Sequence, residues 1–201
     1  MNSTTVSIIL VNYNSFELTR NCINSIIDNI RSVAYEIIVV DNASKDDSAV
    51  LLKQLFPEIT IIKSEANLGF GKANNLGAKN AKGEYLFLLN TDTILLNDPF
   101  PFFLSFNDSH PQAGAIGTHL VNKENKPSLA GGSIYSKRKY LKRFILRLFG
   151  RQANNPIPTK GDVEVDYVIG ADMFIKKDLF CRLQGFDEKI FMYFEDGELC
   201  K

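Results

Sequence analysis

Two polar and acidic stretches of this chain follow apolar runs, and their residue types suit chemistry on a diphosphate. Asn90-Thr91-Asp92 comes directly after 84–89 (EYLFLL), and Glu195-Asp196 follows 191–194 (FMYF). Carboxylates that follow buried strands emerge at the carboxyl edge of a sheet, where open α/β folds bind ligands. One such carboxylate can hold a metal ion on a diphosphate, while another can remove a proton from an attacking hydroxyl. Together the two stretches indicate group transfer from a nucleotide-activated donor.

Asp92 is the best candidate for a metal ligand. Mg²⁺ and Mn²⁺ take oxygen ligands, often one or two carboxylates together with phosphate oxygens and water. The alternative is that Asp92 only caps a helix or closes a turn. For Glu195 and Asp196, a low local dielectric beside the aromatic run favours a raised pKa and a general base. The alternative is that these two residues open a helix, where acidic side chains favour the dipole.

Two further stretches are candidates for nucleotide binding. Asp41 follows the apolar run Glu36–Val40 and can accept hydrogen bonds from a base or a ribose, or it can serve as a turn residue. The segment 67–75 (NLGFGKANN) combines glycines, amides and a lysine at an expected helix start, where backbone N–H groups favour anions. Its spacing fits neither the P-loop nor the dinucleotide fingerprint, so this second signal is weak by itself.

The elements that must position these residues alternate between strand and helix. Continuous apolar runs predict buried strands, and apolar residues at helical spacing predict helices between them. The predicted strands are Val6–Val11, Glu36–Val40, Ile59–Ile62, Glu84–Leu89, Ala113–Val121, Val163–Ile169 and Met173–Ile175. Asn14 with Glu17 is expected to cap the first helix, and Ser44 the second. The second helix is expected to bury Val50, Leu51, Leu55 and Phe56.

This alternation predicts an α/β fold, a doubly wound and mostly parallel central sheet. We interpret the chain as a single domain, 1–201, whose first part, 1–120, forms the nucleotide-binding half. The segment 121–160 is variable and basic, and 161–201 forms the acceptor-side half.

The stretch Lys137–Arg151 has seven basic and no acidic residues, with Leu141, Phe144, Ile145 and Leu148 at helical spacing. A basic amphipathic helix can lie on an anionic membrane surface. A solvated loop whose apolar residues pack on the domain is the alternative.

Composition narrows the classes of protein. The 201 residues carry equal numbers of basic and acidic side chains, 23 of each, which disfavours a nucleic-acid binder. The three cysteines lack CxxC spacing, so a disulfide framework or a zinc site is not expected. No apolar stretch reaches membrane-spanning length without charges. A cytoplasmic protein, peripheral at most on the inner face of the cell membrane, fits these features.

Taken together, the chain resembles the inverting family-2 glycosyltransferases, which have the Rossmann-like GT-A nucleotide-sugar-binding fold, and within them a bacterial rhamnosyltransferase-like group. The matching stretches are 7–14 (SIILVNYN), 37–46 (IIVVDNASKD), 67–93 (NLGFGKANNLGAKNAKGEYLFLLNTDT) and 167–200 (YVIGADMFIKKDLFCRLQGFDEKIFMYFEDGELC). Several motifs in the same order make the resemblance specific, and it spans nearly the whole chain except the basic middle.

The resemblance implies a role for each matching position. Asn12 and Tyr13 would line the nucleobase pocket, and Asp41 would bind base or ribose. Asn67, Gly69, Lys72 and Asn75 would contact the nucleotide, and Asp92 would bind Mg²⁺ or Mn²⁺. Gly170 and Ala171 would border the pocket for sugar and acceptor. Asp196 would be the catalytic base, with Glu195 beside it.

The implied reaction moves a sugar from a UDP- or dTDP-linked donor to the hydroxyl of a saccharide or lipid-linked saccharide, with inversion, in cell-surface polysaccharide synthesis. The chain departs from the family pattern in its single metal carboxylate and in its end at Lys201, where relatives continue, which indicates a C-terminally truncated product. A nucleotide-sugar-binding module without turnover is therefore the alternative. A sugar-phosphate nucleotidyltransferase is disfavoured, because 12–15 (NYNS) replaces the glycine-rich loop that it would need.

Overall fold

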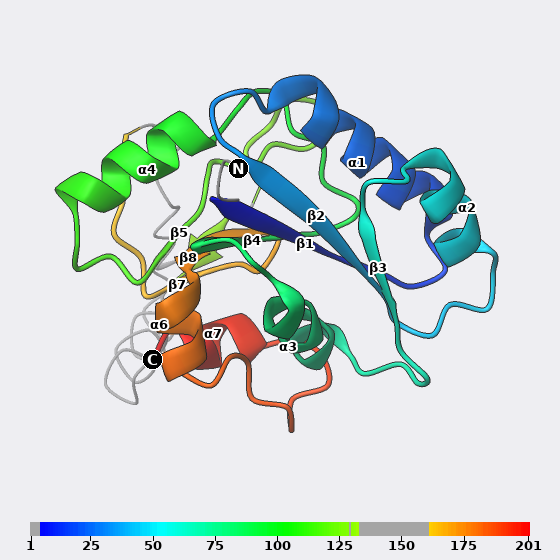
Figure 1. The fold of residues 1–201 in the computed structure, drawn as a ribbon. Helices are drawn as coiled ribbons and strands as arrows, with labels where there is room; N and C mark the ends of the chain where they lie inside the picture. Colours follow the sequence, from blue (N-terminus) through cyan, green and yellow to red (C-terminus); the bar gives the residue numbers. More distant parts are fainter. Residues whose placement is uncertain (1–4, 129, 133–160) are drawn as a thin grey trace, which may run out of the picture.

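The computed structural model of the chain describes residues 5–128, 130–132 and 161–201, and its centre is a six-stranded sheet (Figure 1). The strand order is β3-β2-β1-β4-β8-β5, and a separate two-stranded sheet pairs β6 with β7. The strands are β1 (Val6–Asn12), β2 (Tyr35–Asp41), β3 (Thr60–Lys63), β4 (Tyr85–Leu89), β5 (Ala115–Ile116), β6 (Gly131–Gly132), β7 (Tyr167–Val168) and β8 (Asp172–Lys176).

The four strands that come first in the chain are parallel. They read as nearly continuous apolar runs because helices cover both faces of the sheet. β8 enters later and runs antiparallel to β4, with Leu89 opposite Asp172, and β5 is antiparallel to β8. The mostly parallel α/β sheet expected from the sequence is therefore confirmed. Because β8 runs in the opposite direction, its first residues lie at the edge where β1, β2 and β4 end.

Helices cover both faces of this sheet (Figure 1). They are α1 (Phe16–Asn29), α2 (Ser48–Leu55), α3 (Phe70–Asn80), α4 (Phe100–Ser109), α6 (Lys177–Arg182) and α7 (Glu195–Leu199). The apolar residues of α1, α2 and α4 pack in one core cluster, whereas those of α3, α6 and α7 belong to a second cluster on the other face. The arrangement has three layers, with the sheet between two layers of helices.

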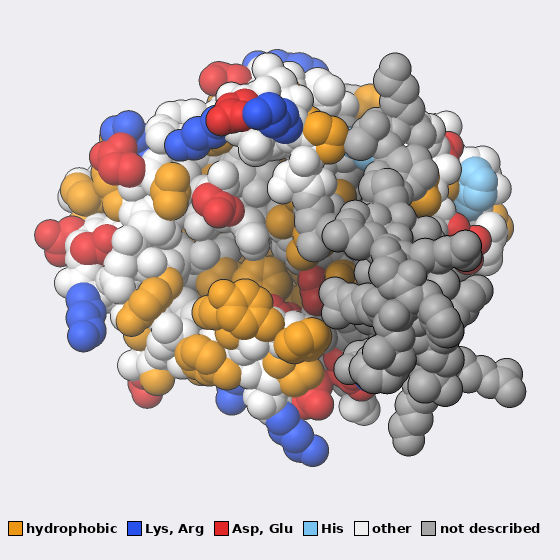
Figure 2. Space-filling model, turned by 180° about the vertical axis from the view of Figure 1, so that it is seen from behind, with side chains coloured by type: hydrophobic (Ala, Val, Ile, Leu, Met, Phe, Trp, Pro, Cys, Tyr) orange, Lys and Arg blue, Asp and Glu red, His pale blue; other side chains and the backbone are white. Residues whose placement is uncertain are grey.

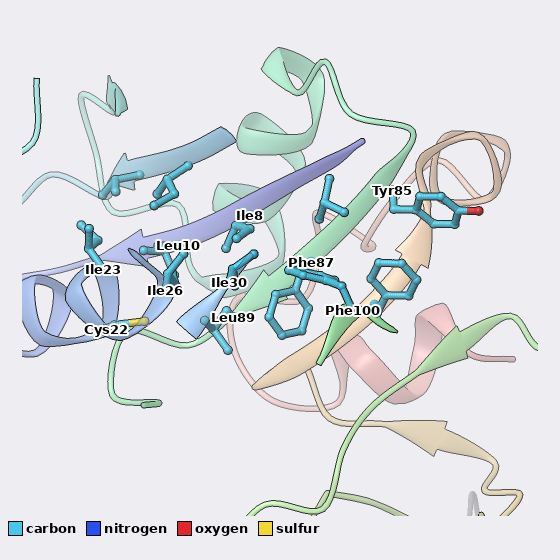
Figure 3. Close-up of a cluster of buried hydrophobic side chains, with 14 of the residues drawn as sticks. Ile8, Leu10, Cys22, Ile23, Ile26, Ile30, Tyr85, Phe87, Leu89 and Phe100 are labelled. Carbon is cyan, nitrogen blue, oxygen red and sulfur yellow. The ribbon is translucent and has the colours of Figure 1, made fainter. Parts of the chain in front are cut away.

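The first core cluster joins aliphatic and aromatic parts (Figure 3). Cys22, Ile23 and Ile26 of α1 pack with Ile8 and Leu10 of β1. At the other end, Phe87, Phe100, Phe103, Phe174 and Tyr85 form ring pairs, with the Phe103 and Phe174 rings stacked at a centroid distance of 4.7 Å. The aromatic end secures β8 to the sheet, because Phe174 lies in that strand.

Small residues let α3 approach the sheet closely. A Cβ atom on Gly77 would lie 2.6 Å from Ile9 Cγ2, and one on Gly71 would lie 2.8 Å from Phe186 Cβ. The internal glycines of this helix therefore serve packing against β1 and against the segment around Phe186. That tight packing places the start of α3 next to Phe186 and Glu195.

Several local expectations were wrong. Neither Asn14 nor Ser44 caps a helix, since α1 begins after Ser15 and α2 after Asp47, neither with a side-chain cap bond. Instead, the Ser44 hydroxyl accepts a hydrogen bond from the Asn14 backbone, and the Asn14 side chain accepts one from Lys45. These contacts tie the loops after β1 and β2 together.

The buried face of α2 was also predicted wrongly. Val50, Leu51 and Leu55 are exposed, whereas Ala49 and Leu52 are buried. The helix begins at Ser48, and residues three apart share its inward face. In addition, only 115–116 and 167–168 of the expected strands 113–121 and 163–169 are strand, because their flanking residues leave the ladder.

Candidate functional site

The carboxyl ends of β1 and β2 place Asp41 in a buried hydrogen-bond network. Asn12, opposite Asp41 in the parallel register, donates from Nδ2 to Asp41 Oδ1 at 2.8 Å and to Ser44 Oγ at 3.0 Å. Asn12 Oδ1 accepts from the hydroxyls of Ser15 and Thr19. One oxygen of the Asp41 carboxylate is therefore held in place by a neighbour whose own orientation is fixed.

This network corrects the expectation for Asn12. Its side chain is 0% exposed and all its polar atoms are paired within the protein, so it orients Asp41 and does not line a pocket. Tyr13, the next residue, is exposed.

The turn before α3 is fastened to β2 through Asn42, a residue to which the sequence analysis gave no role. Asn42 Oδ1 accepts from the Leu68 backbone at 2.8 Å, and its Nδ2 donates to Asn67 Oδ1 at 3.0 Å and to the Gly69 carbonyl at 3.2 Å. Gly69 has a positive φ of 78°, which favours glycine. The signal that could have found Asn42 is its place directly after Asp41 at the sheet edge.

The start of α3 also touches the segment that leads to the acidic pair. The Phe70 backbone N–H donates to the Phe191 carbonyl at 3.2 Å, and a Cβ on Gly69 would lie 2.1 Å from that same oxygen. Gly71 faces Glu195, whose Cβ lies 3.6 Å from where a Cβ on Gly71 would stand. The structure thus brings the predicted nucleotide segment and the predicted acidic pair together, although they are distant in the sequence.

Glu195 and Asp196 open the short helix α7, yet they differ in their surroundings. Glu195 is only 7% exposed, and its Oε2 has no hydrogen-bond partner among the described residues. Burial raises the pKa of Glu195, and the nearby Asp196 adds to the effect. Asp196 is half-buried, and its Oδ1 accepts from the Gly197 backbone at 2.8 Å. Of the two carboxylates, Asp196 is the one that a substrate can reach.

The residues before α7 are unusually exposed for their type. Tyr193 and Phe194 are 74% and 84% exposed, and both have positive φ, which is uncommon for large side chains. Hydrophobic side chains gather on the lower half of the face drawn in Figure 2.

The loop after β4 reaches the same edge. The Asn90 N–H donates to the Ala171 carbonyl at 3.0 Å, and the Phe70 ring fills the space beside Gly170, where a Cβ would lie 2.7 Å from Phe70 Cε1. Gly170 and Ala171 thus lie between the loop that carries Asp92 and the start of α3. The Asp92 side chain is exposed, and its charge adds to the effect of burial that raises the pKa of Cys22 to about 12.

The donor set at Asp92 fits a metal ion only when a diphosphate supplies further ligands. Among the described residues, no group of three or more His, Cys, Asp and Glu side chains could hold an ion without other ligands. One exposed carboxylate with phosphate oxygens and water is nevertheless a common set for Mg²⁺. The chemistry of Asp92 therefore suits a metal that arrives with the nucleotide.

Asp172, the first residue of β8, was missed by the sequence analysis. It is 3% exposed, its Oδ2 accepts from the Thr118 backbone and hydroxyl, both at 2.6 Å, and its Oδ1 has no partner among the described residues. Burial raises the pKa of Asp172 to about 6, against the opposing effect of the Thr118 hydrogen bonds.

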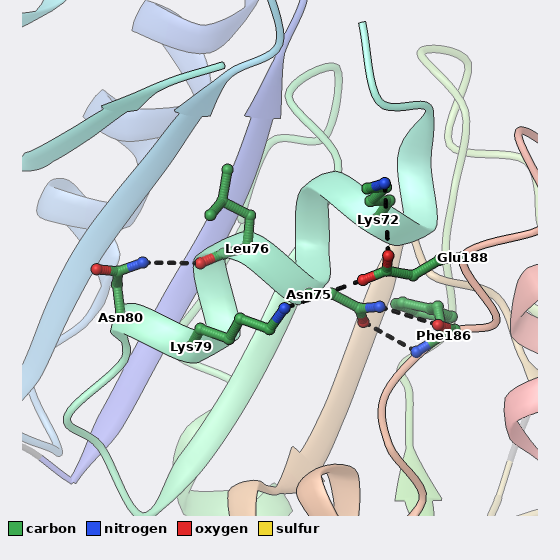
Figure 4. A network of polar contacts seen from close by, with 7 residues as sticks. All are labelled: Lys72, Asn75, Leu76, Lys79, Asn80, Phe186 and Glu188. Carbon is green, nitrogen blue, oxygen red and sulfur yellow. Dashed lines mark hydrogen bonds and ion pairs between the residues drawn. The ribbon is translucent and has the colours of Figure 1, made fainter. Parts of the chain in front are cut away.

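Lys72 and Asn75 both contact the segment 186–188 (Figure 4). Lys72 Nζ forms an ion pair with Glu188 at 3.5 Å on the surface. The Asn75 amide is buried and pairs with the Phe186 backbone in both directions. Both of its polar atoms are committed to the protein, which corrects the expectation that Asn75 contacts a nucleotide.

The described residues bear on one of the two expectations about the membrane. The basic stretch Lys137–Arg151 lies outside the described residues. Within the described part of the chain, no helix has both the length and the apolar character needed to cross a bilayer.

A Rossmann-like α/β sheet with carboxylates at its carboxyl edge has the arrangement at which open α/β folds bind ligands. Residues 7–179 match the model of glycosyl transferase family 2, and the chain belongs to that family. Rhamnosyltransferase WbbL of Escherichia coli is 31% identical over 180 residues, covering 83% of this chain and 65% of that protein. The N-acetylglucosaminyl-diphospho-decaprenol L-rhamnosyltransferase of Mycobacterium tuberculosis is 24% identical over 189 residues, covering 81% of this chain and 59% of its own.

Solved structures show the same GT-A fold. S. aureus TarS superposes with a TM-score of 0.69 at 16% identity, over 98% of this chain and 33% of TarS. The mannosyltransferase PcManGT from Pyrobaculum calidifontis, in complex with GDP-Man and Mn²⁺, superposes with a TM-score of 0.65 at 18% identity, over 99% of this chain and 51% of that chain. The fold expected from the sequence is confirmed, while this chain spans about two thirds or less of the length of these relatives.

Proposed function

We propose that this chain transfers a sugar from a UDP- or dTDP-linked donor to the hydroxyl of a saccharide or lipid-linked saccharide, with inversion. The observation that carries the proposal is the meeting of Asp41, the 67–70 turn and Glu195-Asp196 at one edge of the sheet. TarS has been solved with UDP and with UDP-GlcNAc, and the mycobacterial relative is named for a lipid-linked acceptor. These relatives support both the donor class and the acceptor class.

Asp41 would accept a hydrogen bond from an N–H or hydroxyl group of the nucleoside, through the carboxylate oxygen that Asn12 does not contact. The turn 67–69, secured by Asn42, would face the rest of the nucleotide. Residues 170–171 would border the sugar between this turn and the Asp92 loop. In this scheme 1–120 binds the nucleotide and 161–201 receives the acceptor.

The reaction is a single displacement at the anomeric carbon. The acceptor oxygen would form the new glycosidic bond while the bond to the diphosphate breaks, and Asp196 would take the hydroxyl proton. Glu195, buried beside it with a raised pKa, is the next candidate for the base. A divalent ion held by Asp92 with the diphosphate would offset the charge of the leaving group.

We also propose that the protein acts at the inner face of the cell membrane, in the synthesis of cell-surface polysaccharide. The lipid-linked acceptor in the name of the mycobacterial relative supports action at a membrane. The segment Lys137–Arg151, with its basic and apolar residues, would supply the contact with anionic lipid.

The test follows nucleoside diphosphate release from UDP- and dTDP-sugars with a lipid-linked saccharide acceptor. Asp196→Asn should lower acceptor-dependent release by about 10²–10⁴, the usual contribution of a general base, while donor affinity survives. Asp178→Asn, which changes an exposed carboxylate on α6, is the matched control and should retain the wild-type rate. Wild-type protein that binds nucleotide and releases nothing with any acceptor would instead make this chain a binding module.

A further inference from the structure

We propose that Asn75 is a positioning residue that holds the segment leading to Glu195 and Asp196 against α3. The effect on catalysis rests on the proposed function, whereas the effect on local structure does not. The contact joins two segments that are 111 residues apart in the chain.

The geometry at Asn75 is reciprocal (Figure 4). Its Nδ2 donates to the Phe186 carbonyl at 2.9 Å, and its Oδ1 accepts from the Phe186 N–H at 2.9 Å. The side chain is 5% exposed, so water cannot replace either partner readily. A primary amide is the side chain that offers a donor and an acceptor on one short stem, and here it satisfies both backbone groups of one residue.

The neighbouring residues are adapted to this pair. Gly185 has a φ of 70°, and a Cβ there would lie 2.3 Å from Asn75 Oδ1. The chain can therefore approach the amide only with glycine at this position. The Phe186 ring, 1% exposed, packs on Gly71 and forms ring pairs with Phe70 and Phe180.

A second tie lies at the far end of the same segment. Phe191 accepts from the Phe70 backbone, so both ends of 186–191 are bound to α3. Between them, Glu188 pairs with Lys72 at 3.5 Å and Lys79 at 4.0 Å. These ion pairs are on the surface and contribute little, which leaves the buried amide as the stronger of the side-chain ties.

The acidic pair follows directly from this held segment. Glu195 begins α7 shortly after Phe191, and its Cβ stands close to the Gly71 position. The same helix α3 begins at the turn that Asn42 secures for the nucleotide. Asn75 thereby fixes the distance between the 67–69 turn, which would face the nucleotide, and the acidic pair Glu195-Asp196.

The first experiment measures backbone hydrogen exchange in three forms of the 201-residue chain: wild type, Asn75→Ala and the control Asn80→Ala. Asn80 lies on the same helix and donates from Nδ2 to the Leu76 carbonyl, but it is exposed and bonds only within α3. We expect exchange in 186–200 to rise by about tenfold or more in Asn75→Ala alone, since a buried hydrogen-bond pair is lost. Unchanged exchange there, or an equal rise throughout the chain, would overturn the proposal.

The second experiment separates positioning from nucleotide binding. Asn75→Ala should lower the turnover number for transfer by about 10²-fold, the order expected for a misplacement of about 1 Å. UDP affinity should stay near the wild-type value, because Asn42 and not Asn75 holds the 67–69 turn. Equal losses in nucleotide affinity and turnover, or no loss in turnover, would contradict the proposal.

The third experiment uses Asn75→Asp, which keeps the volume of the side chain. A protonated carboxyl group has one donor and one acceptor, as the amide does, whereas the carboxylate has no donor for the Phe186 carbonyl. The ratio of Asn75→Asp to wild-type transfer should therefore rise as the pH falls from 8 to 6, because burial raises the pKa of the new carboxyl group. A ratio independent of pH would refute the role of the paired amide.

The three experiments also distinguish a failure of this proposal from a failure of the proposed function. If the wild-type chain transfers no sugar, the function fails, and exchange in 186–200 still decides whether Asn75 positions the segment. If Asn75→Ala does not fold, Asn75→Asp replaces it in both the exchange and the transfer experiments. Exchange in 186–200 of Asn75→Asp should then slow from pH 8 to pH 6 by more than it slows in wild-type protein, where only the intrinsic effect of pH acts. Equal exchange at 186–200 in folded Asn75→Asp and wild-type protein at pH 8 would refute the proposal.

Discussion

Asp172 makes the stability of this fold depend on pH, and the change to test is Asp172→Asn. The carboxylate is buried at the start of β8, with one oxygen paired to Thr118 and the other unpaired among the described residues. Burial raises the pKa of Asp172 from 3.8 to about 6 in the folded protein. A carboxyl group with a raised pKa in the folded state loses stabilisation as the pH rises from the unfolded value through the folded one. The wild-type protein should therefore lose stability between about pH 4 and pH 7 through this group.

The magnitude follows from the two pKa values. A rise from 3.8 to about 6 corresponds to about 3 kcal/mol at full ionisation, of which about 2.5 kcal/mol develops between pH 4 and pH 8. The amide of Asp172→Asn leaves its own donor unpaired, a cost that does not depend on pH. The informative quantity is the free energy of unfolding of the variant minus that of wild type, which should grow by about 2.5 kcal/mol from pH 4 to pH 8.

Urea unfolding at a series of pH values measures this difference, and the contribution of Glu195 cancels because both proteins carry it. Thr118→Val is the companion variant, because it removes a hydroxyl that favours the ionised form. It should extend the pH-dependent loss to higher pH. Parallel stability curves for wild type and Asp172→Asn would refute the reasoning, and so would a difference that grows toward low pH.

Four other predictions test the site and the core. Asp41→Ala should weaken UDP or dTDP binding by about 1–3 kcal/mol, the cost of an unpaired buried partner, and unchanged affinity by calorimetry would remove Asp41 from the site. Asp92→Asn should abolish the gain in diphosphate affinity that Mn²⁺ confers, whereas wild-type binding indifferent to EDTA would refute the metal hypothesis. Phe103→Ala should lower the free energy of unfolding by about 3–5 kcal/mol, since its ring is buried and stacked on Phe174, and a loss below 1 kcal/mol would show that the cavity collapses. The segment 137–151 should favour anionic over neutral liposomes, with binding that falls as salt rises, and flotation insensitive to both would leave it a solvated loop.

The parallel part of the fold was predictable because its strands are buried on both faces. Continuous apolar residues mark the strands that precede Asp41 and Asn90, and helices connect these parallel strands. The direction of β8 was not predictable, since a short apolar run does not reveal its neighbours. The face of α2 was missed because its apolar residues lie on more than one side of a short helix.

At the site, the sequence predicted which segments lie close together better than it predicted what each residue does there. The segments that carry Asp41, Gly69 and Glu195 do meet at one edge of the sheet. Asparagines, however, donate to protein backbone as readily as to ligands, and sequence alone could not show that Asn12 and Asn75 were already paired. Asn42 and Asp172 were missed since their importance depends on partners far away in the chain.

The placement of β8 has a consequence for how the chain folds as it is made. β4 pairs with β1 on one side, and its other neighbour is a strand near the C-terminal end of the sequence. Until that strand leaves the ribosome, the five apolar and aromatic residues of β4 form a sheet edge with unpaired backbone groups. The ring of Phe103, on which Phe174 stacks in the folded protein, is then uncovered as well. Such an edge favours pairing with other nascent chains, and non-local strands close slowly. The free edge of β4 therefore stays open to such pairing until the chain has been synthesised past residue 176.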